Sequence, residues 1–562
     1  MNINKQINNA CAQVLLKAIK KIDSNALIYT SFINENGFYA DFLFPNKLSS
    51  NDFKIIEKEM KKIIASGNKI EIIPQFKSGL NKYQKYLLNH DKNIQYIKIG
   101  DDFKNIINDE IASNVNKIKF FELTNIGGIY WQNNVKKEQL IRIYGVAFDQ
   151  KEDYEEWKIF LQNQKESDHR KIGQEMEIFT FDNSVGQGLP IWLPNGETIK
   201  NQIKNFLFKI FNQEHFFFLD TPVLGSKKLY EISGHWDHYK ENNFPPIVID
   251  NETFILRPMT CPHHMMVYKQ KPHSYRELPI YYCENSKLHR YESSGGLIGL
   301  ERVRYMELFD CHIICKADQI EEVVKKLDGI LRTVHEKLQI KIDQVDLSLH
   351  DKNDKEKYHD DPKMWEKAES QLRNILKQLK YNAVEMEGEA AFYGPKIDYQ
   401  AKSNLGKMIT ISTIQLDFLL PKKFELEYLD ENLKKQRPVL IHFGVIGTYE
   451  RFIATILSQT KGILPFWLFP VQVALIPINN EYHLEYAEIV YKKLKDYGLR
   501  VKLDDSNERL SKKIRDAQIS KIPYQIIIGD SERDNKNISF RKYGENESTT
   551  KTIDEFLKML KL

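Results

Sequence analysis

Hydrophobic and polar positions follow four successive patterns along the chain. Residues 1–150 combine a helical opening at 13–21 with alternating stretches such as IEIIPQF and LIRIYGVAF, which predicts a small α+β domain. The charged, glycine-poor segment 151–172 predicts one long exposed helix that serves as a linker. In residues 173–466 strand patterns dominate, with turn signals at PNGE, SGH and SSGG. Residues 467–562 alternate strands with amphipathic helices and predict a small open α/β domain.

Composition narrows the class of protein without naming a function. A chain of 562 residues has room for about three or four domains, and its 42% apolar residues are typical of a globular protein. No apolar run reaches the roughly 18 residues of a membrane span, and the first residues lack the order of a signal peptide. Five unevenly spaced cysteines indicate reduced thiols and a cytoplasmic location.

Charge neither requires nor excludes nucleic acid. The chain has 81 basic and 77 acidic residues, and a local basic face is enough to attract phosphate. The C-terminal segment contains neither GxGxxG nor GxxxxGK followed by Ser or Thr. If the chain uses ATP, another domain must hold it.

Three possible metal ligands lie far apart in the middle of the sequence. Cys261 follows the apolar stretch FILRPMT, His312 lies in FDCHIIC, and His442 ends PVLIH, so each stands at a predicted strand or its end. One sheet would bring them together. Three such ligands with an open fourth position predict a catalytic type of zinc site. The alternative is that all three are packing residues, as most isolated buried Cys and His are.

A basic set accompanies these ligands. Arg290 lies in LHRYE, Arg302 and Arg304 lie in LERVRYMELFD, and Arg451 lies in GTYERF. The stretch from LHRYE through SSGG to LERVRYMELFD predicts strand, loop and strand. Such a hairpin, with arginines that form bidentate phosphate contacts, fits a bent triphosphate. Taken singly, each arginine also fits a solvated surface charge.

The two sets together resemble the class II aminoacyl-tRNA synthetases. That class binds ATP on an antiparallel sheet with an R-x-E in a strand–loop–strand and a later arginine at the start of a helix. Here HRYE supplies Arg290 and Glu292, and GTYER supplies Arg451. Pro222 in FLDTPVL matches the third motif of the class, which lies at the dimer interface.

Within the class, the chain resembles the threonyl-tRNA synthetases from about residue 7 to its end. The stretches that carry the resemblance are SGHWDHYKENNF, RPMTCPHHM, LHRYESSGGLIGLERVR, AAFYGPKIDY, TIQLDFLLP and PVLIHFGVIGTYERF. The resemblance implies an α+β fold with three parts: a degenerate editing-like domain at 1–150, an antiparallel-sheet catalytic domain at 173–466 and an anticodon-binding α/β domain at 467–562. It also implies a homodimer that binds L-threonine, ATP and tRNA(Thr) and does not bind membranes.

The resemblance further implies the residues of each site. One zinc ion per chain would be held by Cys261, His312 and His442 and would bind the amino group and hydroxyl of threonine, which valine cannot match. The residues that match the threonine pocket are Met259, Asp310, Tyr393 and Gln415. Those that match the ATP site are Arg290, Glu292, Arg302 and Arg451, with Mg²⁺ bridging the phosphates. Those that match the catalytic and transfer positions are Arg290, Arg451, His235 and Lys396. Those that match anticodon contacts are Asn507, Arg515, Glu532 and Arg541.

The chain departs from the family pattern at several positions. Leu308 replaces a polar pocket residue, His263 stands where glycine is usual, and Phe443 replaces a basic residue. The ubiquitin-like domain that begins bacterial relatives is expected to be missing. In the editing-like domain the usual His pair falls on Gln13 and Lys17.

These two replacements predict a loss of proofreading. Residues 105–120 contain neither the Cys nor the His of the second editing pair, and Cys11 and His90 are the only Cys and His before His169. Amide and ammonium groups are poor substitutes for imidazole near neutral pH. The sequence therefore predicts an enzyme that cannot hydrolyse Ser-tRNA(Thr).

Three other readings compete with an active threonyl-tRNA synthetase. A prolyl or seryl synthetase would not need the separated Cys/His/His set together with GHW and FYGPKI. An RNA-binding or regulatory descendant would be expected to lose ATP or zinc positions, whereas all of them remain. A structural protein would leave the Cys/His/Arg pattern without a purpose.

Overall fold

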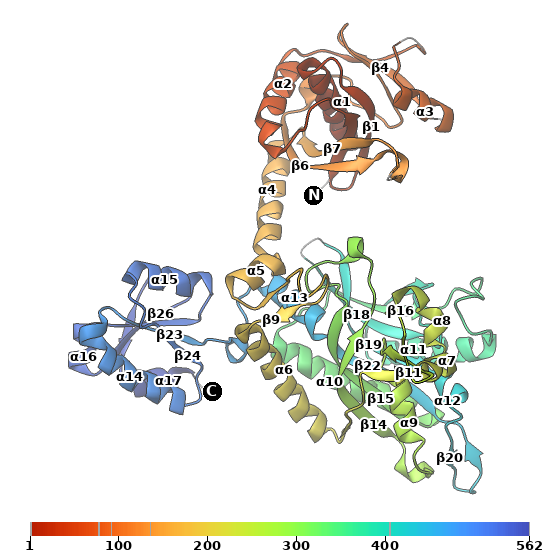
Figure 1. Cartoon of the computed structure of the whole chain (residues 1–562), viewed down its shortest axis with the longest axis vertical. Helices are drawn as coiled ribbons and strands as arrows, with labels where there is room; N and C mark the ends of the chain where they lie inside the picture. The colour runs from red at the N-terminus through yellow and green to blue at the C-terminus, as the bar shows by residue number, and fades with distance from the viewer. Residues whose placement is uncertain (1–2, 77–78, 92, 135, 404–405, 561–562) are drawn as a thin grey trace. The chain divides into compact units, whose positions relative to one another are not determined.

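The computed structural model describes residues 3–76, 79–91, 93–134, 136–403 and 406–560. The chain divides into two compact units, Met1–Asn163 and Gln164–Leu562 (Figure 1). Among the described residues, no helix combines the length and apolar character that crossing a bilayer requires.

The first unit is an α+β domain built around one buried helix. Its four-stranded antiparallel sheet has the order β1-β2-β7-β6, and α1 packs against β1, β2 and β7. Helix α1 is buried over most of its length, which explains its run of apolar and small residues. A second sheet has the order β3-β4-β5. The elements are α1 (Lys5–Ile22), β1 (Leu27–Asn34), β2 (Gly37–Leu43), α2 (Phe53–Ala65), β3 (Ile70–Ile73), α3 (Lys82–His90), β4 (Gln95–Ile99), β5 (Lys104–Ile107), β6 (Phe120–Tyr130) and β7 (Gln139–Phe148).

The predicted single linker helix is wrong, because two helices occupy this segment. Helix α4 is Lys151–Glu166 and α5 is His169–Glu175. The side chain of Asp168 accepts a hydrogen bond from the backbone N–H of Arg170 and so caps the start of α5. The segment is also not exposed throughout, since Trp157 and His169 are buried.

An eight-stranded sheet forms the framework of the second unit. Its order is β10-β14-β15-β22-β19-β18-β16-β17, and its pairs are antiparallel except for β10 with β14 and β16 with β17. The predicted, mainly antiparallel sheet is thus confirmed. The strands are β10 (Phe217–Phe218), β14 (Ile280–His289), β15 (Tyr305–Cys315), β16 (Gln344–Leu349), β17 (Val384–Glu387), β18 (Lys396–Lys402), β19 (Met408–Asp417) and β22 (Val439–Thr448).

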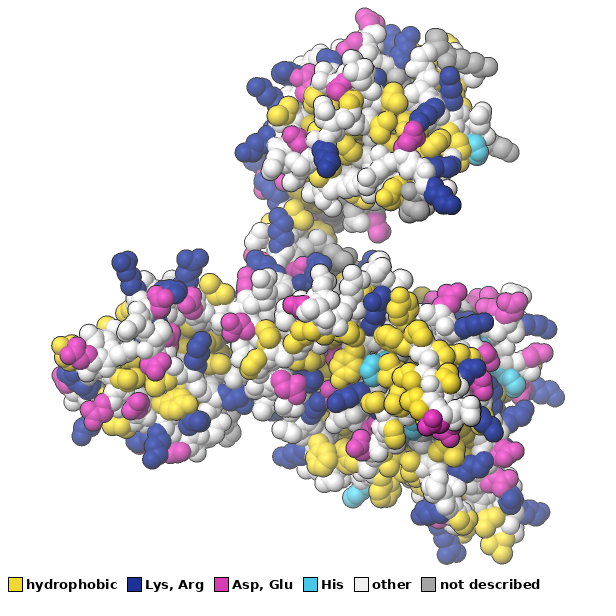
Figure 2. All heavy atoms as spheres, viewed as in Figure 1, with side chains coloured by type: hydrophobic (Ala, Val, Ile, Leu, Met, Phe, Trp, Pro, Cys, Tyr) yellow, Lys and Arg dark blue, Asp and Glu magenta, His cyan; other side chains and the backbone are white. Residues whose placement is uncertain are grey.

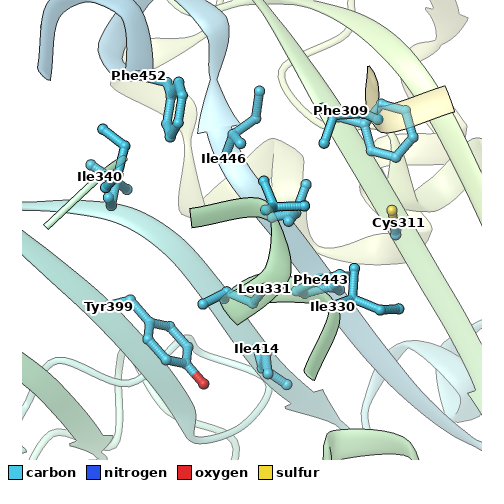
Figure 3. Close-up of a cluster of buried hydrophobic side chains, with 14 of the residues drawn as sticks. Phe309, Cys311, Ile330, Leu331, Ile340, Tyr399, Ile414, Phe443, Ile446 and Phe452 are labelled. Carbon is cyan, nitrogen blue, oxygen red and sulfur yellow. The ribbon is translucent and has the colours of Figure 1, made fainter. Parts of the chain in front are cut away.

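Helices bury one face of this sheet in a large apolar core. Phe309 and Cys311 on β15 and Phe443 on β22 point into it with Leu331 of α10 and Phe452 of α13 (Figure 3). The helices and smaller elements around the sheet are β8 (Phe179–Thr180), β9 (Ile191–Trp192), α6 (Pro194–Gln213), β11 (Leu224–Ser226), α7 (Lys227–Ser233), α8 (His235–His238), β12 (Ile247–Ile249), β13 (Glu252–Leu256), α9 (Cys261–Tyr268), α10 (Ile320–Leu338), α11 (Pro362–Gln378), α12 (Leu420–Lys423), β20 (Tyr428–Leu429), β21 (Lys435–Gln436) and α13 (Tyr449–Thr460).

The C-terminal part of the second unit is the predicted α/β fold. Its sheet has the order β24-β23-β25-β26-β27, in which β23 is parallel to β24 and β25, and the last two strands are antiparallel. Gly498, at a φ of 95°, follows the end of α14 where a side chain would be strained. The elements are β23 (Val473–Pro477), α14 (Asn480–Asp496), β24 (Val501–Leu503), α15 (Leu510–Ile519), β25 (Tyr524–Ile528), α16 (Asp530–Asn535), β26 (Ile538–Lys542), β27 (Thr549–Lys551) and α17 (Ile553–Leu560).

Candidate active site

Cys261, His312 and His442 meet in the second unit. His312 on β15 pairs directly with His442 on β22, and Cys261 is the first residue of α9. One potential ligand atom from each lies within 4.8 Å of the others, and all three side chains are buried. The expectation that each stands at a strand or its end was wrong in detail. Cys261 begins a helix, and His442 lies inside its strand.

The protonation of these groups fits a bound divalent cation. Burial, followed by the charges of Asp310 and Asp417, raises the pKa of the Cys261 thiol well above its usual value. Burial, followed by His264 and His442, lowers the pKa of His312 well below its usual value. The imidazole is therefore neutral, the form that ligates metals. A cation is what would hold the buried sulfur as a thiolate, and a thiolate with two imidazoles suits zinc.

His442 is fixed by a carboxylate that the sequence analysis missed. Its Nε2 lies 2.9 Å from Oδ2 of Asp417, and Oδ1 of Asp417 accepts hydrogen bonds from the backbone N–H groups of Leu419 and Leu420 at 2.8 Å. A carboxylate behind a histidine ligand orients the ring. The stretch TIQLD carries Asp417, but only the pairing of β19 with β22 reveals the contact.

The predicted threonine pocket lies against the three ligands. Gln415 pairs with His442 across the sheet. The hydroxyl of Tyr393 donates a hydrogen bond of 2.7 Å to Oε1 of Gln415. The ring of Tyr393 stacks on His442 with 4.8 Å between centroids. Asp310 is two residues before His312, and Met259 is two residues before Cys261. The structure therefore places Tyr393 and Gln415 against His442, and Asp310 is close enough for its charge to act on Cys261.

The arginines meet beside this pocket. The guanidinium of Arg290 lies 3.0 Å from the sulfur of Met259, and Nε of Arg451 donates to the carbonyl of Glu301 at 3.2 Å. Arg302 pairs with Glu292 at 2.9 Å. Burial, followed by the charge of Arg290, lowers the pKa of Arg451, so the two cations are close enough to repel. Such an arrangement favours a polyanion between them.

A cavity opens beside these arginines. Its volume is about 320 Å³, and its lining residues are Glu292, Ile298, Glu301, Arg302, Met408, Ile409, Thr410 and Arg451. Glu292, Arg302 and Arg451, all predicted ATP contacts, thus face one space.

Comparison with known proteins decides the family. Residues 244–460 match the model described as tRNA synthetase class II core domain (G, H, P, S and T), and residues 472–561 match the anticodon binding domain. The chain is 48% identical to the threonine–tRNA ligase of Ureaplasma parvum serovar 3, covering 99% of this chain and 98% of that protein. It is 43% identical to the threonine–tRNA ligase of Geobacillus kaustophilus, covering 99% and 86%. The chain belongs to the threonyl-tRNA synthetase family. It is a threonine–tRNA ligase, a class II aminoacyl-tRNA synthetase.

Solved structures of this family agree. The crystal structure titled as the RNA binding domain of threonyl-tRNA synthetase from Cryptosporidium parvum Iowa II has a TM-score of 0.65 and 35% identity, covering 70% of this chain and 98% of that one. The putative threonyl-tRNA synthetase ThrRS-1 from Aeropyrum pernix has a TM-score of 0.60 and 27% identity, covering 70% and 94%.

The two predicted transfer residues of the synthetase each lie beside a residue of the site. His235 begins α8, and its Nε2 lies 3.6 Å from Sγ of Cys261. Its Nδ1 contacts Oγ of Ser233 at 2.8 Å, and burial, followed by His442, lowers its pKa to about 3. Lys396 lies on β18 opposite Gln415, and its ammonium group donates a hydrogen bond to the carboxylate of Asp398.

The predicted anticodon residues lie in the C-terminal part of the synthetase. Asn507 and Arg515 are exposed, before and on α15. Glu532 accepts from Oγ of Ser539 at 2.6 Å, and Arg541 donates to the side chain of Gln525 at 3.2 Å. Among the described residues, no hydrogen bond or ion pair links the four to one another. The Nε of Arg541 is buried without a partner in the structure.

The three departures from the family pattern, at Phe443, Leu308 and His263, each fit their local surroundings. Phe443 faces the apolar core because it follows His442 in an extended strand, and neighbouring side chains point to opposite faces. Leu308 packs against Leu288, Val303 and Met306. Nδ1 of His263 lies 3.3 Å from the hydroxyl of Tyr230.

The two side chains at the predicted editing positions, Gln13 and Lys17, both make polar contacts. Gln13 donates to Oγ of Ser31 at 2.8 Å and accepts from Asn105 at 2.7 Å, and Asn105 in turn accepts from Gln84. Lys17, which is 2% exposed, donates to the carbonyl of Ile99 at 2.7 Å and to Asp102 at 2.6 Å. Both side chains are committed to structural contacts.

Proposed function

We propose that the chain activates L-threonine with ATP at a site holding one zinc ion, and transfers the threonyl group to the 3′ end of tRNA(Thr) without hydrolysing Ser-tRNA(Thr). The observation that carries this proposal is the buried Cys/His/His set next to the converging arginines. A thiol and two neutral imidazoles fit zinc, and facing cations fit a triphosphate.

Cys261, His312 and His442 would hold the zinc ion. When bound, zinc would act as a Lewis acid that coordinates the amino group and the hydroxyl of threonine. Valine lacks the hydroxyl, so a required polar contact rejects it far better than an apolar pocket would. Asp310 accepts the hydrogen bond of the hydroxyl, and the Tyr393–Gln415 pair forms the neighbouring wall.

The arginines position ATP for attack on the α-phosphate by the threonine carboxylate. Arg290 and Arg451 would bind the α- and γ-phosphates with the help of Arg302 and Glu292, and Mg²⁺, when bound, would offset part of the phosphate charge. In this in-line displacement the protein contributes mainly orientation and charge stabilisation. His235 and Lys396 act in the transfer of the threonyl group to the terminal ribose, and the four C-terminal residues read the anticodon.

The contacts of Gln13 and Lys17 support the loss of editing. Gln13 is tied into an amide network, and Lys17 is paired with Asp102, so neither is available to activate water. Cys11 is also unsuited, because burial raises the pKa of its thiol well above the usual value. Serine keeps both groups that bind zinc and lacks one methyl, which is worth about 1–3 kcal/mol or about 10- to 200-fold. The degenerate domain therefore leaves mischarged tRNA uncleared.

Exposed apolar side chains support a homodimer. All three residues of β12 are exposed, with Val248 at 69%, and Phe217 on β10, the edge of the large sheet, is 62% exposed. Figure 2 shows apolar side chains gathering on the part of the surface that overlies β11. Exposed apolar edges of this kind are usually covered by a partner. Val248→Lys is expected to shift the sedimentation of the chain from dimer to monomer, and an unchanged dimer would count against this interface.

We also propose a cytoplasmic location and four successive segments of the chain. The five cysteines are unpaired and buried, which supports a cytoplasmic location. The boundaries 1–150, 151–172, 173–466 and 467–562 stay predictions.

Metal analysis combined with amino-acid-dependent ATP–pyrophosphate exchange tests the synthetic site. About one zinc per chain and exchange with threonine, weaker exchange with serine and none with valine are expected. Absence of both zinc and exchange would overturn the proposal. Preformed Ser-tRNA(Thr) tests the editing claim separately: hydrolysis faster than the spontaneous rate would show that editing persists.

A further inference from the structure

A chain of buried polar side chains lies behind His312. Its Nδ1 is 2.9 Å from Nδ1 of His264, and Nε2 of His264 is 3.1 Å from Oε2 of Glu284. Glu284 also accepts hydrogen bonds from Arg257 at 2.7 Å and from the hydroxyl of Thr221 at 2.6 Å. His264 and Glu284 are 0% and 2% exposed. Water therefore does not replace these contacts.

With an ionised Glu284 and neutral imidazoles, one placement of protons satisfies all of these contacts. Arg257 can only donate, and an ionised Glu284 can only accept, so Nε2 of His264 must carry a hydrogen. A neutral His264 then accepts at Nδ1, and the hydrogen between the two rings belongs to Nδ1 of His312. Nε2 of His312 is left with its lone pair, which is the arrangement that a metal ligand needs.

Glu284 is suited to fix this order of donors and acceptors, because it is an ionised acceptor. Burial opposes its charge, but hydrogen bonds from His264 and Thr221 and the charge of Arg257 keep its pKa below the usual value. Arg257 is 1% exposed and donates further to the carbonyl groups of Lys287 and Thr221. Arg257, the last residue in this row of hydrogen bonds, is thus anchored to two backbone carbonyl groups.

The contacts also link two ligands through one helix. Cys261 and His264 are three residues apart on α9, a spacing that places them on one face of a helix. Glu284 on β14 pairs with Asp310 on β15, the strand that carries His312. One helix therefore supplies a ligand and, one turn later, the support of a second ligand.

We propose that His264, Glu284 and Arg257 are positioning residues that hold His312 in its Nδ1–H tautomer and direct its Nε2 at the metal. This inference rests on the proposed zinc site. It gives the two histidine ligands different supports, since His442 meets the carboxylate of Asp417 directly. The ring of His264 lies between Glu284 and His312, so Glu284 orients His312 without touching it. The carboxylate of Glu284 is thereby kept away from a metal site that already has Asp310 and Asp417 beside it.

Zinc affinity of the full chain, measured by competition with a chelator, tests the proposal. His264→Leu removes both contacts and is expected to weaken zinc binding by about 10- to 100-fold. His264→Asn places an acceptor near His312 but does not reach Glu284, whereas His264→Gln reaches Glu284 but not His312. Both variants are expected to bind zinc more weakly than the wild type, because each loses one of the two hydrogen bonds of His264. The visible spectrum of the cobalt(II)-substituted protein is expected to change in all three variants.

His273→Gln is the matched control. His273 is a buried histidine that contacts Glu277 at 3.0 Å and the carbonyl of Tyr268 at 2.9 Å, and it contacts none of the three ligands. Its substitution is expected to leave zinc affinity and the cobalt spectrum unchanged.

The outcomes separate this inference from the proposed function. A wild-type chain that binds no zinc overturns the zinc site itself. Tight zinc binding by the wild type and equally tight binding by the His264 variants overturns only the positioning role. If His264→Leu does not fold, as judged by circular dichroism, the smaller changes His264→Asn and Glu284→Gln decide. Wild-type affinity in both would also overturn the proposal.

Discussion

Oδ2 of Asp417 lies 2.9 Å from Nε2 of His442, and this contact selects the ring nitrogen that remains for a metal. Asp417 is fully buried, and two backbone N–H groups at the start of α12 hold its other oxygen. An ionised Asp417 requires the hydrogen on Nε2, which leaves the lone pair on Nδ1.

Asp417→Asn is expected to weaken zinc binding by about 10- to 100-fold. The amide oxygen can keep the two backbone contacts, but the amide N–H₂ then faces His442 and favours the tautomer with hydrogen on Nδ1. Chelator competition measures the effect. Asp328→Asn is the control, since that buried carboxylate accepts from Tyr381 and Tyr399 and meets no ligand. Equal affinity in Asp417→Asn and the wild type would contradict the tautomer argument.

Arg451→Ala is expected to reduce threonine-dependent ATP–pyrophosphate exchange by about 100- to 1000-fold, the loss typical of one preorganised contact to developing charge. The guanidinium is half-buried at the start of α13, and among the described residues its one hydrogen bond goes to the carbonyl of Glu301, so its charge is free for a phosphate. Arg373→Ala, which removes an exposed pair with Glu385, should leave exchange unchanged. A normal exchange rate in Arg451→Ala would exclude the arginine from the ATP site.

The sequence could predict which residues form the site but not what supports them. Cys261, His312 and His442 stand in stretches with a strong family resemblance, so their meeting was expected. Asp417 supports His442 only because β19 lies next to β22, and a pairing register is not visible in the order of residues. His264 could have been suspected from CPHH, yet its role depends on β14 and β15 lying behind α9.

Two local features of the sequence, an N-cap residue and a strand alternation, indicate structure that the predictions omit. The break between α4 and α5 falls at Asp168, an N-cap residue in the middle of a helical pattern. Phe443 replaces a basic residue of the family pattern, and in the structure it lies on the opposite face of β22 from His442 and fills the core. Strand alternation would have shown this once His442 was placed in a strand interior and not at its end.

Gln13→Leu is expected to destabilise the first unit by about 1–3 kcal/mol, because Ser31 and Asn105 each lose a buried hydrogen-bond partner. Thermal or chemical unfolding of the full chain measures the change. The same variant should deacylate Ser-tRNA(Thr) at the spontaneous rate, as the wild type does. His90→Ala, an exposed ring stacked on Tyr86, should alter neither quantity. A faster deacylation by the wild type than by Gln13→Leu would instead make Gln13 part of a working editing site.

Glu450 makes the stability of the second unit depend on pH. It is fully buried, Oε2 accepts a hydrogen bond from the backbone N–H of Glu307 at 3.0 Å, and Oε1 has no partner in the structure. Burial raises the pKa of Glu450 from 4.5 to about 7. Below the unfolded pKa both states are protonated and nothing is lost, whereas above pH 7 the folded protein must hold a buried charge.

Glu450→Gln should therefore stabilise the enzyme at pH 8 by up to about 3 kcal/mol, and the gain should shrink as the pH falls towards 5. The amide keeps an oxygen for the N–H of Glu307 and removes the charge. Unfolding midpoints of wild type and variant at several pH values measure the difference. Glu321→Gln, an exposed carboxylate paired with Lys325, serves as the control and should show no such trend. A gain of the same size at pH 5 and pH 8, or a loss at pH 8, would show that the ionisation of Glu450 does not limit stability.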